Sequence, residues 1–545
     1  MHIYRITLWT LLVACAAGCS QLQPLPTALQ PAIKITILHT NDHHGRFWKN
    51  GDGEYGMAAR KTVIDAIRSE VSAAGGYSLL LDGGDVNTGV PESDLQDAVP
   101  DFKGMNLLGY DAMAVGNHEF DKPPQVLRLQ RKLAKFPMLS ANIYQGTERL
   151  FDPYKIFTLG GVRVAVMGLT TEDTKRLTNP ENTQNIEFRN PIAEAALLIP
   201  ELQGKADVLI AATHMGHYAD GKHGSLAPGD VEMARAVKGL HLVVGGHSQN
   251  AACMQAENVL DTGYVPGTPC LPDRQNGTWI VQAHEWGKYV GRADFEYQNG
   301  VFKLLRYNLV PINLKRKALL ADGTYTLKTY TAEIPEDPAM LEMLLPHQTF
   351  GQQQLLVRVG ASDARFEGDR SVIRKQATSL GVLIGTAFME RTQADFAVVN
   401  SGGIRESLPA GDISYKDILT VHPFGNTVAL LQLSGVEVMD YLRTAARFTP
   451  GAGGFSHFAG VEMLIKSGEI YNVKIRGKAL DPNTSYRMVI NNFMAAGGDG
   501  YPVVTGHPSY VNTGFLDAEV MRTYIAKKSP LSVSDYQPGQ AVVRQ

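Results

Sequence analysis

The chain has no marked excess of charge of either sign. Its 51 Lys and Arg residues nearly balance its 54 Asp and Glu residues, which leaves a formal net charge of −3 over 545 residues. Binding to a nucleic-acid polymer usually depends on a strongly basic surface, so the overall charge gives no reason to expect such a partner. Internal repeats and low-complexity segments are also missing. The composition, with 44% hydrophobic and 19% charged residues, is typical of a globular protein of about two or three domains.

Only the start of the chain has an apolar run of the kind found in targeting segments. Arg5 precedes ITLWTLLVACAAGC, which is too short and too close to the terminus for a normal membrane-spanning helix. Small residues before Cys19 resemble a bacterial lipobox, which predicts a lipoprotein-type signal peptide over residues 1–18, a lipidated Cys19 and an N-terminal tether over residues 19–32. An ordinary cleaved signal, with Cys19 incidental, is the alternative. Either case predicts export to the periplasm or cell surface, and Ser20 favours the outer membrane, with the lipid as the only anchor.

Cysteine is scarce, with four residues in the whole chain. Cys15 and Cys19 belong to the targeting segment, which leaves Cys253 and Cys270 in a region rich in Gly and Pro. In an oxidising compartment a single remaining pair is best explained by a disulfide, which in a loop of this size would contribute roughly 3 kcal/mol to stability. Two free thiols are the alternative.

Short apolar runs alternate with helical patterns between residue 33 and about residue 250. The runs are IKITILH, YSLLLD, DAMAVGN, PMLSANI, VRVAVMGLT, DVLIAATH and LHLVVGGH. Near-continuous apolar runs of this length predict strands that are buried on both faces of a sheet. Between the first two runs, Val63, Ile64 and Ile67 share one face of a helix predicted near residues 57–74.

The pattern changes after residue 275. Residues 276–314 are typical of antiparallel strands with an Asn-Gly turn, and a helical pattern with a proline near its start follows from Glu336. We therefore expect an α/β protein with a first domain over residues 33–337, a linker helix over residues 338–357 and a smaller mixed α/β domain over residues 358–545.

Polar side chains that can bind metal ions follow five of the apolar runs. They lie in NDHH after the first run, DGGD after the second, GNHEFD after the third, and THMGH and GGHSQ after two later ones. Ligands of α/β sheets bind beyond the carboxyl ends of the strands, so we expect these five groups to converge. Each residue alone has an ordinary explanation, because a single His at a strand end is more often hydrogen-bonded than metal-bound.

The types and number of these residues favour a dinuclear site. Imidazole, carboxylate and amide ligands without a thiolate suit Zn, Mn, Fe, Co or Ni. Seven ligands are too many for one ion and fit two divalent ions about 3.5–4 Å apart with a bridging carboxylate. The candidate ligands are Asp42, His44, Asp85, Asn117, His214, His247 and Gln249. His43 and His217 are either supporting residues or simply polar.

The order D-x-H, GGD, GNHE, H-x-G-H and GGHSQ resembles the calcineurin-like metallophosphoesterases. Longer segments, including ILHTNDHHGRFW, QAHEWGKYVGRADFE and GGDGYP, are similar to the secreted bacterial 5′-nucleotidase/UDP-sugar hydrolase family over essentially the whole mature chain. The resemblance implies a four-layer α/β/β/α metallophosphoesterase domain, a C-terminal nucleotide-binding domain and a disulfide between Cys253 and Cys270. Asp82 departs from the resemblance, because similar sequences usually have Ser at this position. The carboxylate could tune the properties of the metal ions, or it could have a structural role facing a helix, and we favour the structural role.

The resemblance also implies roles for individual residues. The first metal would be held by Asp42, His44, Asp85 and Gln249. The second would be held by Asp85, Asn117, His214 and His247, so that Asp85 bridges. His118 and Asp121 would form the catalytic pair: a metal-bound hydroxide attacks phosphorus in line with the leaving oxygen, His118 neutralises developing charge, and Asp121 orients its ring.

The second half of the chain offers residues for a nucleotide. Arginine matches oxyanions, two phenylalanines can sandwich a base at about 1–3 kcal/mol per stacking contact, and a carboxylate can accept from ribose hydroxyls. The candidates are Arg370, Arg374, Arg405, Phe424, Asn426, Phe493 and Asp499. Taken alone, a phenylalanine in a loop usually packs in the hydrophobic core, and most arginines are solvated. The resemblance implies instead that these seven residues bind the substrate. Since the metal ligands precede residue 250 and these residues follow residue 365, the two domains must meet, and related enzymes rotate the C-terminal domain.

These observations predict an exported hydrolase that depends on two divalent metal ions and acts on nucleotides. It would release phosphate from nucleoside 5′-monophosphates and cleave UDP-sugars and other nucleotides, as a monomer. One alternative is a 2′,3′-cyclic-nucleotide 2′-phosphodiesterase/3′-nucleotidase, which shares the core motifs. The other is a non-catalytic nucleotide-binding lipoprotein, which would require a broken metal set.

Overall fold

The structure is a computed structural model that describes residues 31–178, 182–219, 222–223, 227–320, 323–538 and 542–544. The signal peptide, the lipidated Cys19 and most of the tether predicted from the sequence lie outside these residues. Within the described residues, no helix is long and apolar enough to cross a membrane.

The first domain begins with a six-stranded sheet. Its strand order is β19-β18-β1-β2-β3-β4, with bounds β1 (Ile33–Thr40), β2 (Tyr77–Asp82), β3 (Ala112–Ala114), β4 (Met138–Leu139), β18 (Tyr289–Gln298) and β19 (Val301–Pro311). Strands β1 to β4 are parallel, and β18 and β19 form an antiparallel pair at the β1 edge. The predicted Asn-Gly turn joins this pair, where Asn299 and Gly300 both have positive φ.

A second six-stranded sheet packs on the first. Its order is β16-β17-β13-β10-β8-β7, with bounds β7 (Tyr154–Leu159), β8 (Val162–Thr170), β10 (Val208–His214), β13 (Leu242–Val244), β16 (Asp273–Gln275) and β17 (Thr278–Val281). The four central strands are parallel, and both edge strands are antiparallel. These sheets contain every strand that the apolar runs predicted.

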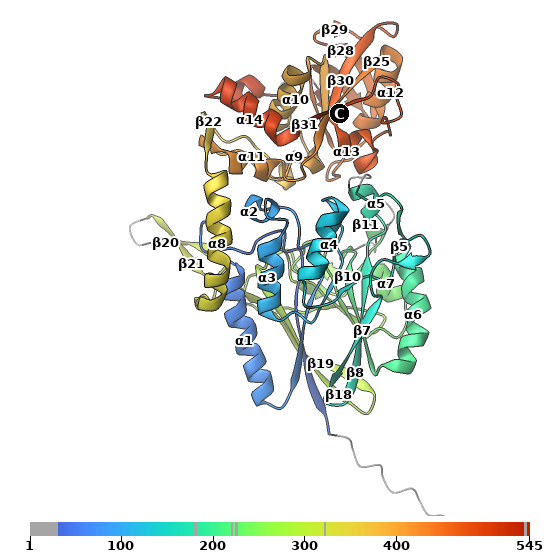
Figure 1. The fold of residues 1–545 in the computed structure, drawn as a ribbon, viewed down its shortest axis with the longest axis vertical. Helices are drawn as coiled ribbons and strands as arrows, with labels where there is room; N and C mark the ends of the chain where they lie inside the picture. Colours follow the sequence, from blue (N-terminus) through green and yellow to red (C-terminus); the bar gives the residue numbers. More distant parts are fainter. Residues whose placement is uncertain are drawn as a thin grey trace, which may run out of the picture.

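Alternation along β10 explains why two sheets stack. Val208 and Ile210 join the core between the sheets, whereas Leu209 and Ala211 join the core beneath the helices of the second sheet. Helices α6 (Pro191–Lys205) and α7 (Asp230–Ala236) cover that outer face, and α1 (Met57–Ala73) and α3 (Val99–Leu108) cover the outer face of the first sheet (Figure 1). The expected α/β/β/α layering is thereby confirmed.

Helix α8 (Pro338–Leu355) leads from the first domain to the second. The side chain of Asp337 caps its start by accepting from the backbone N–H of Met340, and the helix packs against α1, α3 and the short α2 (Pro91–Asp94). Gly351 is required at the contact with α2, since a Cβ there would lie 2.5 Å from Cγ of Glu92.

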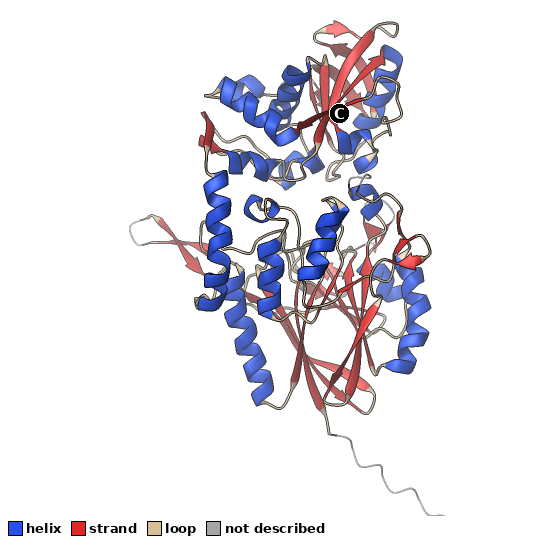
Figure 2. Ribbon diagram, viewed as in Figure 1, coloured by secondary structure: helices blue, strands red, loops and turns tan. Residues whose placement is uncertain are grey.

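The second domain is a smaller mixed α/β unit that faces the end of the first (Figure 2). Its main sheet has the order β26-β23-β30-β25-β31. The strands are β23 (Phe396–Asn400), β25 (Thr427–Ser434), β26 (Ser456–Ala459), β30 (Ser485–Asn491) and β31 (Val511–Leu516). Residues of β23 alternate between a core shared with α10 (Ser379–Thr392) and α14 (Asp517–Lys528) and a core shared with α12 (Gly435–Ala446).

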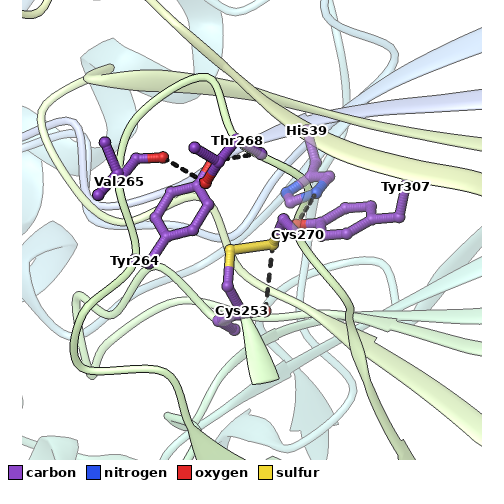
Figure 3. The surroundings of a disulfide bond; sticks show 8 residues. His39, Cys253, Tyr264, Val265, Thr268, Cys270 and Tyr307 are labelled. Atoms are coloured by element: carbon purple, nitrogen blue, oxygen red, sulfur yellow. Dashed lines mark hydrogen bonds between the residues drawn. A yellow bond between two sulfur atoms is a disulfide. The ribbon is translucent and has the colours of Figure 1, made fainter. Parts of the chain in front are cut away.

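Cys253 and Cys270 are joined by a disulfide in the segment between β13 and β16, with an S–S distance of 2.01 Å. Both residues are buried in the core of the first domain. The bond lies beside His39, Tyr264 and Tyr307 (Figure 3). It therefore ties the loop that follows the GGHSQ motif to the residues that lead into β16, the edge strand of the second sheet.

Asp82, the residue that departs from similar sequences, ends β2 and is buried. Its carboxylate accepts from the hydroxyl of Thr40 at 2.5 Å and from the backbone N–H of Gly84 at 2.9 Å. It therefore shapes the turn before Asp85 and fastens it to β1, which is a structural role. Burial raises the pKa of Asp82 to about 7.

We expect the Asp82→Asn variant to be more stable than the wild type at alkaline pH. The raised pKa means that the folded state keeps a proton that the unfolded chain loses above about pH 4, so ionisation destabilises the fold as pH rises from about 4 to 7. Asn has no charge, keeps an acceptor oxygen for N–H of Gly84, and can donate to the Thr40 hydroxyl as the protonated acid does. Denaturation of chelator-treated protein should show a gain on the order of 1–4 kcal/mol at pH 8 that vanishes near pH 4. A difference that is constant with pH would contradict the titration of Asp82.

Candidate active site

The loops after β1, β2, β3, β10 and β13 meet at one end of the two sheets. Backbone hydrogen bonds join the first two loops, from N–H of Asp42 to the carbonyl of Gly84 at 2.9 Å and from N–H of His44 to that of Asp85 at 3.0 Å. The second sheet is tied in by N–H of His247, which donates to Oδ2 of Asp42 at 2.9 Å. The convergence expected from the strand ends is present.

Asp85 lies at the centre of the convergent side chains. Its Oδ2 is 2.9 Å from Nε2 of His214 and 3.9 Å from Nε2 of both His44 and His118. Two groups of potential metal ligands share it, one with His44 and His118 and one with His214 and His247, and the ligand atoms of each group lie within 4.8 Å of one another. A single carboxylate thus belongs to both halves of the site.

The remaining candidate ligands adjoin these two groups. Oδ1 of Asn117 lies 3.1 Å from Nε2 of His214, a side-chain nitrogen of Gln249 lies 2.9 Å from Nε2 of His44, and Oδ1 of Asp42 lies 3.8 Å from that same Nε2. All seven predicted ligands are therefore brought together. His43 and His217 are not in the groups: their Nε2 atoms lie 2.8 Å from carboxylate oxygens of Asp101 and Asp273, respectively.

The backbone of this site is unusual. Left-handed backbone is uncommon for residues other than glycine and costs on the order of 1–3 kcal/mol per residue. Five of the seven candidate ligands have φ between 50° and 75°: Asp42, His44, Asp85, His247 and Gln249. Close approach adds a further demand, since a Cβ on Gly116 would lie 2.1 Å from Oδ1 of Asp85. Strain gathered at one set of side chains is typical of a functional site.

The arrangement fits metal cations. Oδ1 of Asp42 is buried and has no hydrogen-bond partner among the described residues. A bound cation would satisfy this oxygen, because buried acceptors are normally paired. Nε2 of His214 faces the Asp85 carboxylate and lies 3.2 Å from Nδ1 of His247. Burial alone would lower the pKa of His214, but the Asp85 carboxylate outweighs it and raises the pKa to about 10. A metal ion would supply the positive charge that this proton otherwise provides.

His118 and Asp121 form a pair beside the candidate ligands. They belong to the short helix η1 (His118–Phe120) and the residue that ends it, and Nδ1 of His118 lies 2.6 Å from Oδ2 of Asp121. Burial alone would lower the pKa of His118, but the carboxylates of Asp121 and Asp85 raise it. The ring stacks on Phe424 of the second domain, with centroids 6.0 Å apart and planes at 15°.

One cavity of about 620 Å³ is lined by both domains. The first domain contributes Asp85, Asn117, His118, Asp121, Leu177, His247 and Gln249. All seven predicted substrate-binding residues line it from the other side: Arg370, Arg374, Arg405, Phe424, Asn426, Phe493 and Asp499. Nη1 of Arg370 donates to Oε1 of Gln249 at 2.9 Å, and Lys416 pairs with the buried carboxylate of Glu92 at 2.5 Å, so the domains are in direct contact.

The second-domain side of the cavity is strongly cationic. Burial lowers the pKa of Arg374 to about 9 and that of Arg405 to about 10, and the charge of Arg370 adds to both effects. Nε of Arg374 is buried without a hydrogen-bond partner among the described residues. Such guanidinium groups are suited to an anionic ligand. Asp499 is held nearby by Asn400, whose side chain donates to it at 2.7 Å.

Sequence reasoning missed Glu119, which supports the site without facing the cavity. Its buried carboxylate accepts from the backbone N–H groups of Gly116 at 2.7 Å, Asp85 at 3.0 Å and Val86 at 2.8 Å. It thereby holds the loops after β2 and β3 together. The only signal was its place inside GNHEFD. Arg447 and the loop from Phe448 to Gly454 also line the cavity, and nothing in the sequence marked them.

Comparison with known proteins agrees with this arrangement of two domains around one cavity. Residues 35–250 match the family described as calcineurin-like phosphoesterase, and residues 358–506 match the family described as 5′-nucleotidase, C-terminal domain. The chain is 58% identical to Protein UshA of Escherichia coli strain K12, with 93% of each chain covered, and 52% identical to a 5′-nucleotidase of Vibrio cholerae, with 99% of each covered. The crystal structure of a 5′-nucleotidase precursor from Thermus thermophilus is similar with a TM-score of 0.73 at 28% identity, over 94% of this chain and 99% of that one. The chain therefore belongs to the family of bacterial 5′-nucleotidases and UshA proteins, in which a calcineurin-like phosphoesterase domain precedes a 5′-nucleotidase C-terminal domain.

Proposed function

We propose that the protein is a metal-dependent hydrolase that releases phosphate from nucleoside 5′-monophosphates. One observation carries the proposal: the cluster of potential metal ligands and the cationic, Phe-lined surface of the second domain share a single cavity of about 620 Å³. A phosphate can reach the cluster there while the attached nucleoside remains against Phe424 and Phe493. The family membership supports the same chemistry.

Two divalent ions, of the Zn, Mn or Co type, would be held on the two sides of Asp85. They would supply Lewis-acid activation of water and neutralise charge on the phosphate. One ion would be held by Asp42, His44, Asp85 and Gln249, and the other by Asp85, Asn117, His214 and His247. The shared position of Asp85 in both ligand groups supports this division.

The chain's own residues would bind and orient the substrate and move the proton. Nδ1 of His118 stays on Asp121, which leaves Nε2 to face the phosphoryl oxygens or the leaving oxygen. The raised pKa of His118 keeps a proton available to neutralise charge there. The arginines would bind the anionic part of the substrate, and Asp499 would accept from ribose hydroxyls.

A wider substrate range is part of the proposal. UDP-sugars and other nucleotides likewise carry phosphate groups and a base, and residues Arg447 to Gly454 add to the lining of the cavity. A 3′-nucleotidase acting on 2′,3′-cyclic nucleotides is the second candidate, because it would use the same metal ligands.

Export through residues 1–18, lipid attachment at Cys19 and a monomeric state are proposed on the sequence alone, as are the domain limits at residues 33–337, 338–357 and 358–545. We expect the mature N-terminal peptide of protein purified from membranes to carry a diacylglyceryl or triacyl mass on Cys19, measured by mass spectrometry. A peptide that begins with unmodified Cys19 or further along the chain would instead indicate an ordinary cleaved signal.

The central expectation concerns activity. Purified protein should release inorganic phosphate from AMP and UMP and should cleave UDP-glucose, whereas 3′-AMP should be a poor substrate. A chelator should abolish release, and added Mn²⁺, Co²⁺ or Zn²⁺ should restore it, because the proposed mechanism depends on metal ions to activate the attacking water. Preference for 3′-AMP would favour the second candidate, and activity that survives complete metal removal would rule out the metal-dependent mechanism.

Metal analysis with matched variants separates ligands from the catalytic pair. Wild-type protein should hold two ions per chain, and Asp85→Asn should lose most of both. His118→Ala should keep its metal while kcat falls by about 10²–10⁴, the usual range for a positioned acid–base group. Because His118 lies within reach of His44 and Asp85, loss of an ion from this variant would identify it as a ligand instead.

Replacement of Phe424 tests the nucleoside pocket. Phe424→Ala should raise KM for AMP by an amount that corresponds to roughly 1–3 kcal/mol of lost base stacking, and Phe493→Ala should act similarly. Steady-state kinetics with a small phosphate ester that carries no base provide the control. Since Phe424 also stacks on His118, an equal loss of kcat on that ester would show that Phe424 serves the histidine rather than the base.

A further inference from the structure

The segment from Gln282 to Trp286, directly after β17, has no role in the chemistry described so far. It carries no candidate ligand and does not line the cavity between the domains. It runs between two loops that do carry ligands: the loop after β1, with Asp42 and His44, and the loop after β13, with His247 and Gln249. Its side chains and backbone form hydrogen bonds to both.

Gln282 is completely buried and holds the loop after β13. Its Nε2 donates to the carbonyl of Gly246 at 2.6 Å, and its Oε1 accepts from Oγ of Ser248 at 2.8 Å and from N–H of Asn250 at 2.9 Å. These three partners alternate along the chain with the candidate ligands His247 and Gln249. One amide therefore fixes the backbone before, between and after both ligands.

The same segment holds the loop after β1 through its backbone. N–H of Ala283 donates to Oδ1 of Asn41 at 2.8 Å, and the Asn41 amide donates in turn to the carbonyl of His284. N–H of Trp286 donates to the carbonyl of Asp42 at 2.7 Å. Five residues after one strand thus set the spacing between ligands that come from two different sheets.

The loop after β13 needs such support. His247 and Gln249 have φ of 75° and 57°, a conformation that residues with a side chain adopt only when their surroundings impose it. Partners of metal ligands fix their orientation, and replacing such partners typically lowers metal affinity about 10–100-fold. Gln282 is a partner of this kind through the backbone: its three hydrogen bonds go to residues that flank His247 and Gln249 rather than to the side chains of these ligands.

We propose that Gln282 is a positioning residue for the metal site, whose amide holds His247 and Gln249 at the correct distance from Asp42. The inference rests on the proposed function, because it assumes that these residues bind metal ions. It assigns no contact with substrate to Gln282. Its loss should therefore weaken metal binding and leave KM for the nucleotide unchanged.

Binding of Co²⁺ to chelator-treated full-length protein, followed by calorimetry and by the visible absorption of the bound ion, provides the test. Gln282→Met, which keeps the volume but removes the three hydrogen bonds, should bind Co²⁺ about 10–100-fold more weakly. At saturating Co²⁺ its kcat for AMP should return to within about threefold of wild type, with KM unchanged. Gln282→Glu, which keeps the acceptor but not the donor, should lie between Gln282→Met and wild type.

Asn106→Leu is the matched control. Asn106 in α3 also fastens a loop through its amide, donating to the carbonyl of Leu133 at 2.8 Å and accepting from N–H of Lys135 at 2.7 Å, and neither partner adjoins a candidate ligand. This variant should lose stability and keep wild-type affinity for Co²⁺. Equal weakening in both variants would show that Co²⁺ affinity follows general stability and would overturn the positioning role.

The remaining outcomes are also decisive. Wild-type affinity in folded Gln282→Met would overturn the proposal, whereas failure of the wild type to bind Co²⁺ would overturn the metal assignment itself. Should Gln282→Met not fold, Ser248→Ala removes one of the three contacts, together with the hydrogen bond from N–H of His217 to the Ser248 hydroxyl at 3.0 Å, and should weaken Co²⁺ binding about two- to tenfold. Unchanged affinity in Ser248→Ala would then count against the role of Gln282.

Discussion

A buried carboxylate at the junction of two sheets is the constraint on which the site depends. Asp85 is 2% exposed, and an ionised carboxylate in such a place is costly unless nearby groups compensate its charge. Burial would raise the pKa of Asp85, yet His214, His118 and His44 keep it low. These residues come from different strand ends. If the loops separated, the Asp85 carboxylate would either become exposed to solvent or stay buried without the histidines that compensate its charge. The left-handed backbone of five candidate ligands is tolerated because this convergence holds it.

The sequence predicted the fold and the members of the cluster well, for local reasons. Apolar runs such as YSLLLD and DVLIAATH are buried on both faces, and strands of that kind occur in parallel sheets with ligands beyond their carboxyl ends. The Asn-Gly turn between β18 and β19 is equally local, because its conformation favours those two residues. The prediction of the buried parallel strands and that of the Asn-Gly turn each use only a residue and its neighbours in the sequence. Neither prediction therefore required knowledge of the tertiary structure.

What the sequence did not reveal are contacts between distant segments. Glu119 accepts from N–H groups more than thirty positions away, and Gln282 bonds a loop 32 to 36 positions before it. Neither residue type nor spacing distinguishes them from a solvated Glu or Gln. Asp82 was singled out by its departure from similar sequences and a structural place was favoured for it, but its partners are Thr40 in β1 and Gly84 in the next turn rather than a helix, and only the structure shows them. Ligands are recognised by their chemistry, but the residues that orient them are recognised only by geometry.

The position of the arginines links substrate binding to the contact between the domains. Arg370 lies close enough to Arg374 and Arg405 to add to the lowering of their pKa values by burial, which means that bringing these cations together is unfavourable without an anion. Arg370 also reaches Gln249 across the domain boundary, and Lys416 reaches Glu92. An anion that binds the arginines and the metal site together would stabilise the arrangement in which the two domains are in contact. The stabilisation equals the difference between the anion's binding free energies to this arrangement and to one in which the domains are apart. By reciprocity, a contact that favours this arrangement of the domains also raises the affinity for such an anion, so the Lys416–Glu92 pair would contribute to anion binding without lining the cavity.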